Sequence, residues 1–368
     1  MDKITTSNFK LKQPNKNNTY KKIEDNLDKI LSGTFSSIKC KSFNTGCTAN
    51  VWLLELDKNT KIVLKQVPYE PSFISGKIFE NLLLFSKNSK HIIKPLHQFK
   101  KNNKHYVLYE YAEPIRKTNA KDLDKALIPL LKTSELLKSQ IKLPERTENE
   151  KFFIKARGLK IYDANLLNKE ITKIDPKLKI NTKPLILVKK LVKYFSSNQS
   201  FASMYKKLPK SFIHGDLTSG NIIVTKNGYK IIDWDAAYYE NRIKEISVFL
   251  VRQIDKPENF RLIEGKIKNL LKVLKKNDIK LNETEIKNMP IFIILSLIES
   301  SISWICSSLV SEKLTPPLPT IAEPPLKDKK TKEILACSLI TNLKFIEYWQ
   351  ENNSVFKDLV KKIEGNCS

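Results

Sequence analysis

The sequence contains few of the residues that mark secreted or membrane proteins. Its five cysteines among 368 residues are odd in number and form no C-x-x-C pair, which is not the pattern of a disulfide framework. The N-terminal residues do not have the form of a signal peptide. The most apolar window, residues 290–310, contains Glu299 and several serines, and it predicts a buried helix rather than a membrane span. We therefore expect a cytoplasmic protein with no membrane partner.

Acidic residues are scarce relative to basic ones. The chain has 65 Lys+Arg against 39 Asp+Glu, a formal net charge of +26. A basic surface concentrates anions such as nucleotides and can also attract nucleic acid. Because nearly all of the excess is lysine, with no basic stretch interleaved with a stacking motif, we favour a compositional origin and do not expect a nucleic-acid partner. A basic nucleic-acid-associated protein remains one alternative.

Residues 211–237 contain the most informative motif. His214-Gly215-Asp216 is followed by Asn221, then by two β-rich runs that flank Asn227-Gly228, and finally by Asp233. Asn-Gly between two such runs predicts a β-hairpin, which would bring Asn221 and Asp233 to neighbouring strand ends. An Asp, an Asn and a second Asp in this order are typical of a phosphoryl-transfer site.

The chemistry of phosphoryl transfer assigns a role to each of these residue types. Asp216 is the candidate catalytic base, which would orient an acceptor hydroxyl and take its proton. Asn221 and Asp233 offer the hard oxygen ligands that Mg²⁺ prefers alongside phosphate oxygens. His214 is expected to brace the loop rather than to transfer a proton. The sequence thus predicts ATP and Mg²⁺ as cofactors.

Residues 35–67 predict the nucleotide-binding part as three strands. The turn at residues 44–50 is small and polar, and backbone N–H groups near Gly46 and Thr48 could approach phosphates. Lys65 lies in an apolar run, where an ammonium group needs an anionic partner, unless it simply faces solvent on an edge strand. Glu80, on a helix predicted over residues 71–89, is the expected partner of Lys65.

A further strand is predicted over residues 105–113. It runs into a connector in which the backbone from Glu110 to Ala112 could bond an adenine edge.

These motifs resemble the aminoglycoside phosphotransferase and choline kinase family, the small-molecule branch of the protein-kinase-like fold. The resemblance rests on HGDLTSGNIIV, on IIDWDAA and more loosely on NTGCTANVWLLEL and IVLK, and it spans roughly residues 35–252. It implies that Asp216 is the catalytic aspartate, Asn221 and Asp233 the magnesium ligands, and Lys65 the lysine that contacts phosphate. Ser219, where the family often has proline, removes no reacting group.

The resemblance also implies an α+β, bilobal fold. We expect a tail and short helix over residues 1–34, a nucleotide-binding lobe with an antiparallel sheet and one main helix over 35–112, and a mostly helical lobe over 113–368. Within the second lobe, helical periodicity is seen near the segments 119–138, 151–174, 184–195, 258–276, 283–310 and 330–351.

The same region argues against a protein kinase, because Asp233 is followed by Trp234-Asp235 rather than Phe-Gly and no activation segment ends in Ala-Pro-Glu. Asp235 could support the metal shell or cap a helix. Glu245, in a helix predicted to begin near Arg242, is expected to anchor the catalytic loop.

The acceptor is less defined. A polycationic aminoglycoside would need clustered carboxylates, for which the C-terminal lobe offers Glu299, Glu312, Glu323, Glu347 and Glu351. Choline would favour an aromatic cage, for which Trp304, Tyr348 and Trp349 are candidates. We expect a small-molecule hydroxyl acceptor, with aminoglycoside-like, choline- or ethanolamine-type and homoserine-type options open. A nucleotide-binding pseudokinase is the remaining alternative, and the oligomeric state is unknown from sequence.

Overall fold

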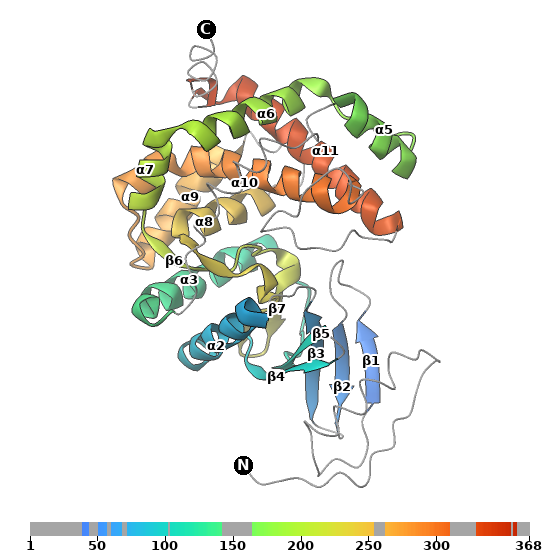
Figure 1. Cartoon of the computed structure of the whole chain (residues 1–368). Helices are drawn as coiled ribbons and strands as arrows, with labels where there is room; N and C mark the ends of the chain where they lie inside the picture. The colour runs from blue at the N-terminus through green and yellow to red at the C-terminus, as the bar shows by residue number, and fades with distance from the viewer. Residues whose placement is uncertain are drawn as a thin grey trace. The chain divides into compact units, whose positions relative to one another are not determined.

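The computed structural model describes residues 39–43, 51–56, 60–67, 72–101, 104–141, 164–253, 262–309, 329–354 and 356–358. The chain divides into two compact units (Figure 1). Unit 1 comprises Met1–Lys117 and Ile223–Asp235, and unit 2 comprises Thr118–Ile222 and Ala236–Ser368. The division falls after Lys117 rather than after Ala112. Unit 1 also includes the hairpin at Asn227-Gly228, which the sequence places in the helical lobe.

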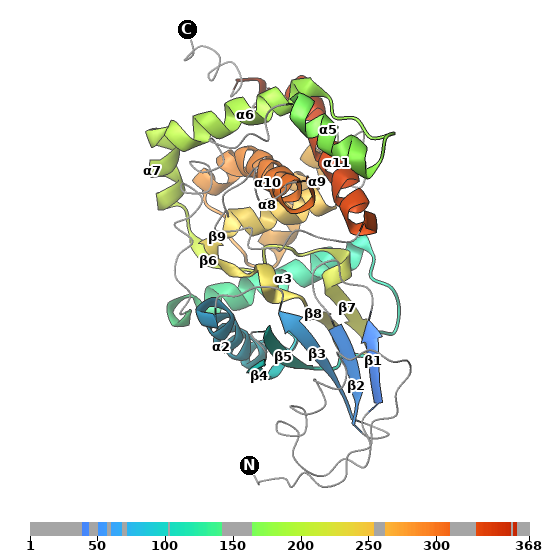
Figure 2. The same cartoon turned by 45° about the vertical axis from the view of Figure 1, so that its right-hand side comes forward.

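Unit 1 is built on a five-stranded antiparallel sheet of order β1-β2-β3-β5-β4 (Figure 2). Its strands are β1 (Lys39–Phe43), β2 (Val51–Glu55), β3 (Lys61–Val67), β4 (Pro95–Lys101) and β5 (Lys104–Glu110). The register places Lys65 of β3 between Val51 and Val107, in the interior of the sheet. Helix α2 (Ser72–Asn88) packs against β4, and its apolar side chains Leu82 and Phe85 are buried.

A hairpin completes unit 1. Strands β7 (Ile222–Thr225) and β8 (Gly228–Ile231) pair with each other, and Gly228 adopts φ +113°, which a residue with a side chain rarely does. Isolated bridges join Ile92 to Ile231 and Arg116 to Val224. These bridges explain why a segment distant in sequence belongs to the sheet unit.

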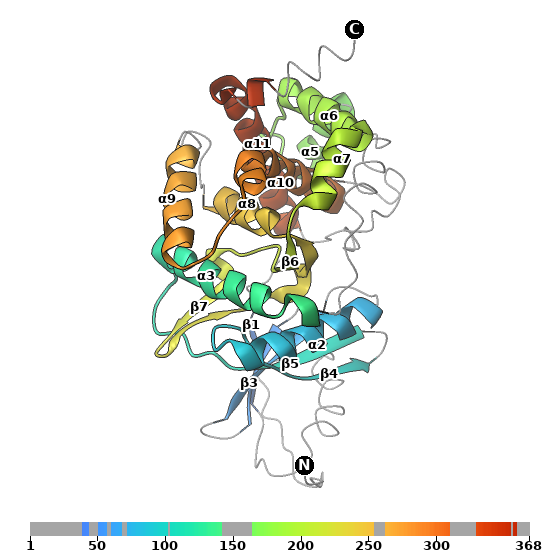
Figure 3. The same ribbon diagram turned by 90° about the vertical axis from the view of Figure 1, so that its left-hand side faces the viewer.

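Unit 2 is predominantly helical (Figure 3). Its α-helices pack mainly around α8 and α10, which bury Phe249 and Phe292. A two-stranded antiparallel ladder, β6 with β9, supports the segment that leads into the His-Gly-Asp motif. The elements are α3 (Ala120–Leu136), η1 (Lys138–Gln140), α5 (Ala164–Ile174), α6 (Thr182–Ser197), α7 (Gln199–Lys207), β6 (Lys210–Ile213), η3 (Ser219–Asn221), β9 (Tyr238–Asn241), α8 (Arg242–Arg252), α9 (Ile263–Lys276), α10 (Glu283–Leu309) and α11 (Lys329–Asn352), with η4 (Trp234–Ala236) crossing the division between the units.

The helical periodicities are confirmed for α2, α3, α5, α6, α8, α9, α10 and α11 within the described residues. The sequence did not predict α7, β4 or the β6–β9 ladder, which are short elements of nine, seven and four residues per strand or helix. The apolar window 290–310 lies mainly in α10, whose described side chains are largely buried in unit 2. Among the described residues, no helix combines the length and the apolar character needed to span a bilayer. The expected helix near residues 20–31 lies outside the described residues.

Candidate active site

The His-Gly-Asp motif forms a tight loop at the end of β6. The imidazole of His214 is fully buried, and its Nδ1 accepts a hydrogen bond from the backbone N–H of Asp216 at 3.2 Å. Gly215 adopts φ +78°, and a Cβ at this position would lie 2.5 Å from the carbonyl oxygen of Ala236. The loop therefore requires glycine here, and His214 braces it as expected.

Glu245 of α8 contacts the backbone of the same loop. Its Oε2 accepts a hydrogen bond of 2.9 Å from the backbone N–H of Gly215, and the side chain is fully buried. Burial raises the pKa of this carboxyl group, while nearby His214 and the N–H of Gly215 act in the opposite direction. The anchoring role predicted for Glu245 is confirmed.

Asp216 and Asn221 are joined directly. The amide Nδ2 of Asn221 donates to the backbone carbonyl of Asp216 at 2.8 Å and to its carboxylate Oδ2 at 3.1 Å. Both partners are acceptors, so the nitrogen of the amide must face them. The carbonyl oxygen of Asn221 is then directed elsewhere, which suits a metal ligand.

Arg252 is a neighbour of Asp216 that sequence analysis did not identify. Its Nη2 lies 3.1 Å from Asp216 Oδ1, in an ion pair that lacks the geometry of a hydrogen bond. The side chains are partly exposed, 30% for Arg252 and 37% for Asp216. Arg252 follows Glu245 by seven residues, about two helical turns, so both lie on one side of α8. That spacing is the signal that could have identified it.

The second pair of site residues lies in unit 1. Lys65 Nζ is 2.5 Å from Asp233 Oδ1, with the lysine side chain only 8% exposed and the aspartate 45% exposed. Asp233 has φ +63°, a backbone conformation that is uncommon for a residue with a side chain and that occurs at functional sites. Asp233 therefore presents an accessible carboxylate from a constrained backbone position.

The residue after Asp233 explains how that backbone is held. The indole of Trp234 is 1% exposed, packs edge-on against Phe85 of α2 with ring centroids 6.2 Å apart, and donates to the carbonyl of Ile231. The buried indole of Trp234 therefore fixes the path of the backbone directly after Asp233. Asp235 lies outside the residues whose side chains are described.

Glu80 does not take the position that the sequence predicted. It lies exposed on α2, and in the described part of the chain the ammonium of Lys65 pairs with Asp233 instead. The sequence could not distinguish the two carboxylates. The contact with Asp233 spans 168 residues and depends on how the hairpin joins the sheet.

The remaining nucleotide-site predictions have mixed outcomes. The Glu110 carboxylate pairs with Lys230, and its backbone N–H donates to the carbonyl of Lys94 at 3.0 Å. The predicted contact of its backbone carbonyl with a nucleotide stays a prediction. Ala112 is buried in the irregular segment that follows β5, and its role stays a prediction. Gly46 and Thr48 lie outside the described residues.

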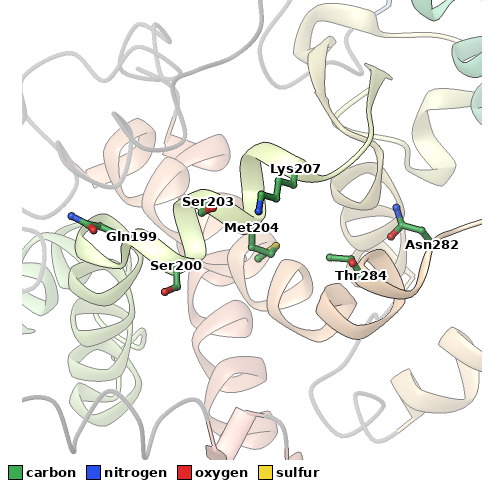
Figure 4. Close-up of a pocket in the computed structure, with 7 residues that line it drawn as sticks. All are labelled: Gln199, Ser200, Ser203, Met204, Lys207, Asn282 and Thr284. Carbon is green, nitrogen blue, oxygen red and sulfur yellow. The ribbon is translucent and has the colours of Figure 1, made fainter.

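The structure thus brings Asp216 and Asn221 together in unit 2, and Lys65 and Asp233 together in unit 1. Within the described residues, no group of three or more His, Cys, Asp and Glu side chains could hold a metal ion. A pocket of about 600 Å³ in unit 2 contains none of these residues (Figure 4); it is lined by Gln199, Ser200, Ser203, Met204, Lys207, Asn282 and Thr284. The pocket therefore does not include the loop that carries Asp216.

Residues 174–271 match the sequence model of a family described as the Phosphotransferase enzyme family. No curated protein sequence matches the chain.

One solved structure shares the fold of the chain. The choline kinase from Cryptosporidium parvum Iowa II superposes with a TM-score of 0.56 at 13% identity, over 88% of this chain and 90% of that chain. A choline/ethanolamine kinase family protein from Mesorhizobium loti gives 0.49 at 11% identity, over 88% and 92%. The gentamicin complex of APH(2")-IIa gives 0.49 at 15% identity, over 90% and 99%. The family match over residues 174–271 and the fold shared with the first of these structures confirm the resemblance that the motifs predicted: part of the chain has the sequence pattern of the phosphotransferase enzyme family, and the chain has the fold of a small-molecule kinase.

Proposed function

We propose that this protein transfers the γ-phosphate of ATP to a hydroxyl group of a small molecule, with Asp216 as the catalytic base. The observation that carries the proposal is the hydrogen-bonded pair of Asp216 and Asn221 in a loop anchored by Glu245. Phosphoryl transfer depends mainly on positioning and charge neutralisation, and a loop fixed in this way supplies a positioned carboxylate.

The other residues of the two pairs, Asn221, Asp233 and Lys65, have separate proposed roles. Asn221 and Asp233 would hold Mg²⁺ through a carbonyl and a carboxylate oxygen, which neutralises phosphate charge. Lys65, which is buried beside Asp233, would contact the phosphates. Backbone groups near Gly46, Thr48 and Ala112 would contact the nucleotide. That both pairs act in one site is part of this proposal.

The chain retains every reacting group that the mechanism needs. Asp216, Asn221, Asp233 and Lys65 are all present, which supports an active enzyme over a nucleotide-binding pseudokinase. Similar structures include a choline kinase, an ethanolamine kinase and a gentamicin complex of APH(2")-IIa. Amino alcohols, aminoglycoside-like antibiotics and homoserine-type metabolites are therefore the acceptors to test first.

Replacing Asp216 by asparagine tests the assignment of the base. The variant keeps the size of the side chain but cannot accept the hydroxyl proton. We expect kcat to fall by about 10²- to 10⁴-fold while nucleotide binding persists. ATP consumption would be measured with aminoglycosides, macrolides, choline, ethanolamine and homoserine, and ATP binding by calorimetry.

The matched control is Asp278→Asn. Asp278 is exposed after α9 and has φ +62°, which asparagine tolerates, so this variant should keep wild-type kcat. Normal turnover by Asp216→Asn would remove Asp216 from the catalytic role.

A further inference from the structure

The chemistry next to Asp216 carries information about the acceptor. Asp216 can act as a base only if the acceptor hydroxyl lies within hydrogen-bond reach of its carboxylate. The Oδ2 atom of that carboxylate is held by Asn221, and the Oδ1 atom lies 3.1 Å from the guanidinium of Arg252. Any acceptor that reaches Asp216 therefore places its neighbouring groups beside a permanent positive charge.

The described carboxylates near this end of α8 contact other groups. The Glu245 carboxylate is buried beneath the loop and accepts from the N–H of Gly215. The carboxylate of Asp124 accepts from Gln253 Nε2 at 3.4 Å, and Gln253 Oε1 in turn accepts from Lys266 Nζ. Arg252 thus remains the charged side chain that contacts the proposed base from α8.

The carboxylates that could bind a polycation are already paired. Glu299 of α10 lies 2.7 Å from the ammonium of Lys244, which is itself 5% exposed. Glu351 of α11 pairs with Lys183 at 3.6 Å, and Glu347 accepts two hydrogen bonds from the amide of Asn181. Glu312 and Glu323 lie outside the described residues.

Of the candidate cage residues, Tyr348 is half-buried and Trp349 lies in the core. Trp349 is 3% exposed and packs against Phe356, with ring centroids 6.3 Å apart, as a core residue does. A quaternary ammonium needs accessible ring faces around it. The side chain of Trp304 lies outside the described residues.

The geometry points to an acceptor that carries an anionic group, a carboxylate or a phosphate, close to the hydroxyl that is phosphorylated, with Arg252 binding that group. This inference rests on the proposed function, because it names the substrate class of the same site. The planar guanidinium presents parallel N–H donors that match the oxygens of a carboxylate or phosphate. On this assignment, Arg252 exchanges its contact with Asp216 for the anionic group when the acceptor binds.

Matched pairs of acceptors test the inference on the full-length enzyme. L-homoserine and 3-amino-1-propanol share a primary hydroxyl and an amine and differ only in the carboxylate. Glycerol 3-phosphate and glycerol differ only in the phosphate. Choline and 3,3-dimethyl-1-butanol have the same shape and differ in the positive charge. Transfer would be measured as kcat/KM with ATP and Mg²⁺ for all six compounds.

We expect the anionic member of at least one of the first two pairs to exceed its neutral or cationic partner by about tenfold to a hundredfold, the size of a contact to a charged group. Which of the two pairs responds distinguishes a carboxylate from a phosphate. In Arg252→Gln this preference should disappear, mainly through a higher KM for the anionic acceptor. Arg252→Lys should keep part of the preference that Arg252→Gln loses, because lysine retains the positive charge but lacks the parallel N–H donors of the guanidinium.

Other outcomes would overturn the inference. A preference for choline over its neutral isostere, unchanged in Arg252→Gln, would show a cation-binding site while leaving the proposed kinase function intact. An equal loss of kcat on every acceptor in Arg252→Gln would place the guanidinium on the transferring phosphoryl group instead. Transfer to an aminoglycoside or a macrolide but to none of the six compounds would overturn the inference and leave the proposed function intact. Transfer to no acceptor at all would count against the proposed function itself.

Discussion

At the scale of single residues, each unit contains a carboxylate that contacts a cation. Asp233 contacts the buried ammonium of Lys65 in unit 1, and Asp216 contacts the guanidinium of Arg252 in unit 2. Lysine is seldom buried without a partner, because the desolvation of its charge is costly. The ion pair with Asp233 therefore fixes the Lys65 ammonium beside a carboxylate that is itself a proposed metal ligand.

Replacing Lys65 by methionine tests its proposed contact with phosphate. Methionine keeps most of the length and apolar volume of the side chain but removes the charge. We expect kcat/KM for ATP to fall by about 10²-fold or more, the size of losing one preorganised electrostatic contact. Steady-state kinetics at varied ATP would measure this change.

Lys61→Met is the control for that variant. Lys61 lies on the same strand, its side chain is 34% exposed, and its ion pair with Glu55 is on the surface. Its kinetics should be close to wild type, since exposed pairs contribute little. If Lys65→Met retained wild-type kinetics, the role of Lys65 at the phosphates would be disproved.

At the scale of elements, α8 organises the catalytic loop. Its first turn contributes Arg242, which binds the buried carboxylate of Glu285 through Nε at 2.7 Å and Nη2 at 2.8 Å. Further along, Glu245 holds the backbone of Gly215, and Arg252 in the last turn reaches Asp216. The conformation of the loop thus depends on one helix that is itself fixed to α10.

The substitution Gly215→Ala tests how tightly the loop is held. A Cβ would add the cost of a positive φ, about 1–2 kcal/mol, and would force a shift away from the carbonyl of Ala236. We expect the free energy of unfolding in urea to fall by more than about 2 kcal/mol and phosphoryl transfer to be lost.

The corresponding control is Gly265→Ala. Gly265 lies within α9, and a Cβ there meets no heavy atom within 4 Å. Alanine should raise the free energy of unfolding by about 0.5–1 kcal/mol, because it restricts the unfolded chain and favours the helix. Equal stability of the two variants would mean that the Gly215 loop is less constrained than the structure indicates.

At the scale of the whole molecule, the net charge of +26 is the feature without an assigned role. A surplus of positive charge attracts ATP over distances that salt shortens, from a Debye length of about 10 Å at 0.1 M to about 3 Å at 1 M. If the lysines aid nucleotide capture, KM for ATP should rise several-fold between about 0.05 M and about 0.5 M NaCl while kcat stays constant. Initial rates across this range would measure it.

The fluorescence and urea midpoint of the protein should be followed across the same salt range, as a control for unfolding. A KM that does not depend on salt would support the compositional origin of the lysine excess. The two readings of the charge therefore predict different kinetics.

The local patterns in the sequence were sufficient for much of the architecture. The period of apolar residues predicted α2 and most helices of unit 2, because an amphipathic face repeats within a few residues. Asn227-Gly228 predicted the hairpin, and the sequence also predicted that His214 braces the loop and that Glu245, in a helix, anchors it. Elements such as β4 and α7 were not predicted because they are short, with seven and nine residues.

By itself, the sequence determined the order of Asp216, Asn221 and Asp233 and the family that this order resembles. Only the tertiary structure decided that Lys65 pairs with Asp233 and not with Glu80, and that Arg252 stands beside Asp216. The physical reason is the separation in sequence between the residues that interact. Helix periods and turns depend on neighbouring residues, whereas an ion pair such as Lys65–Asp233, 168 residues apart, depends on strand register and on how separate segments pack.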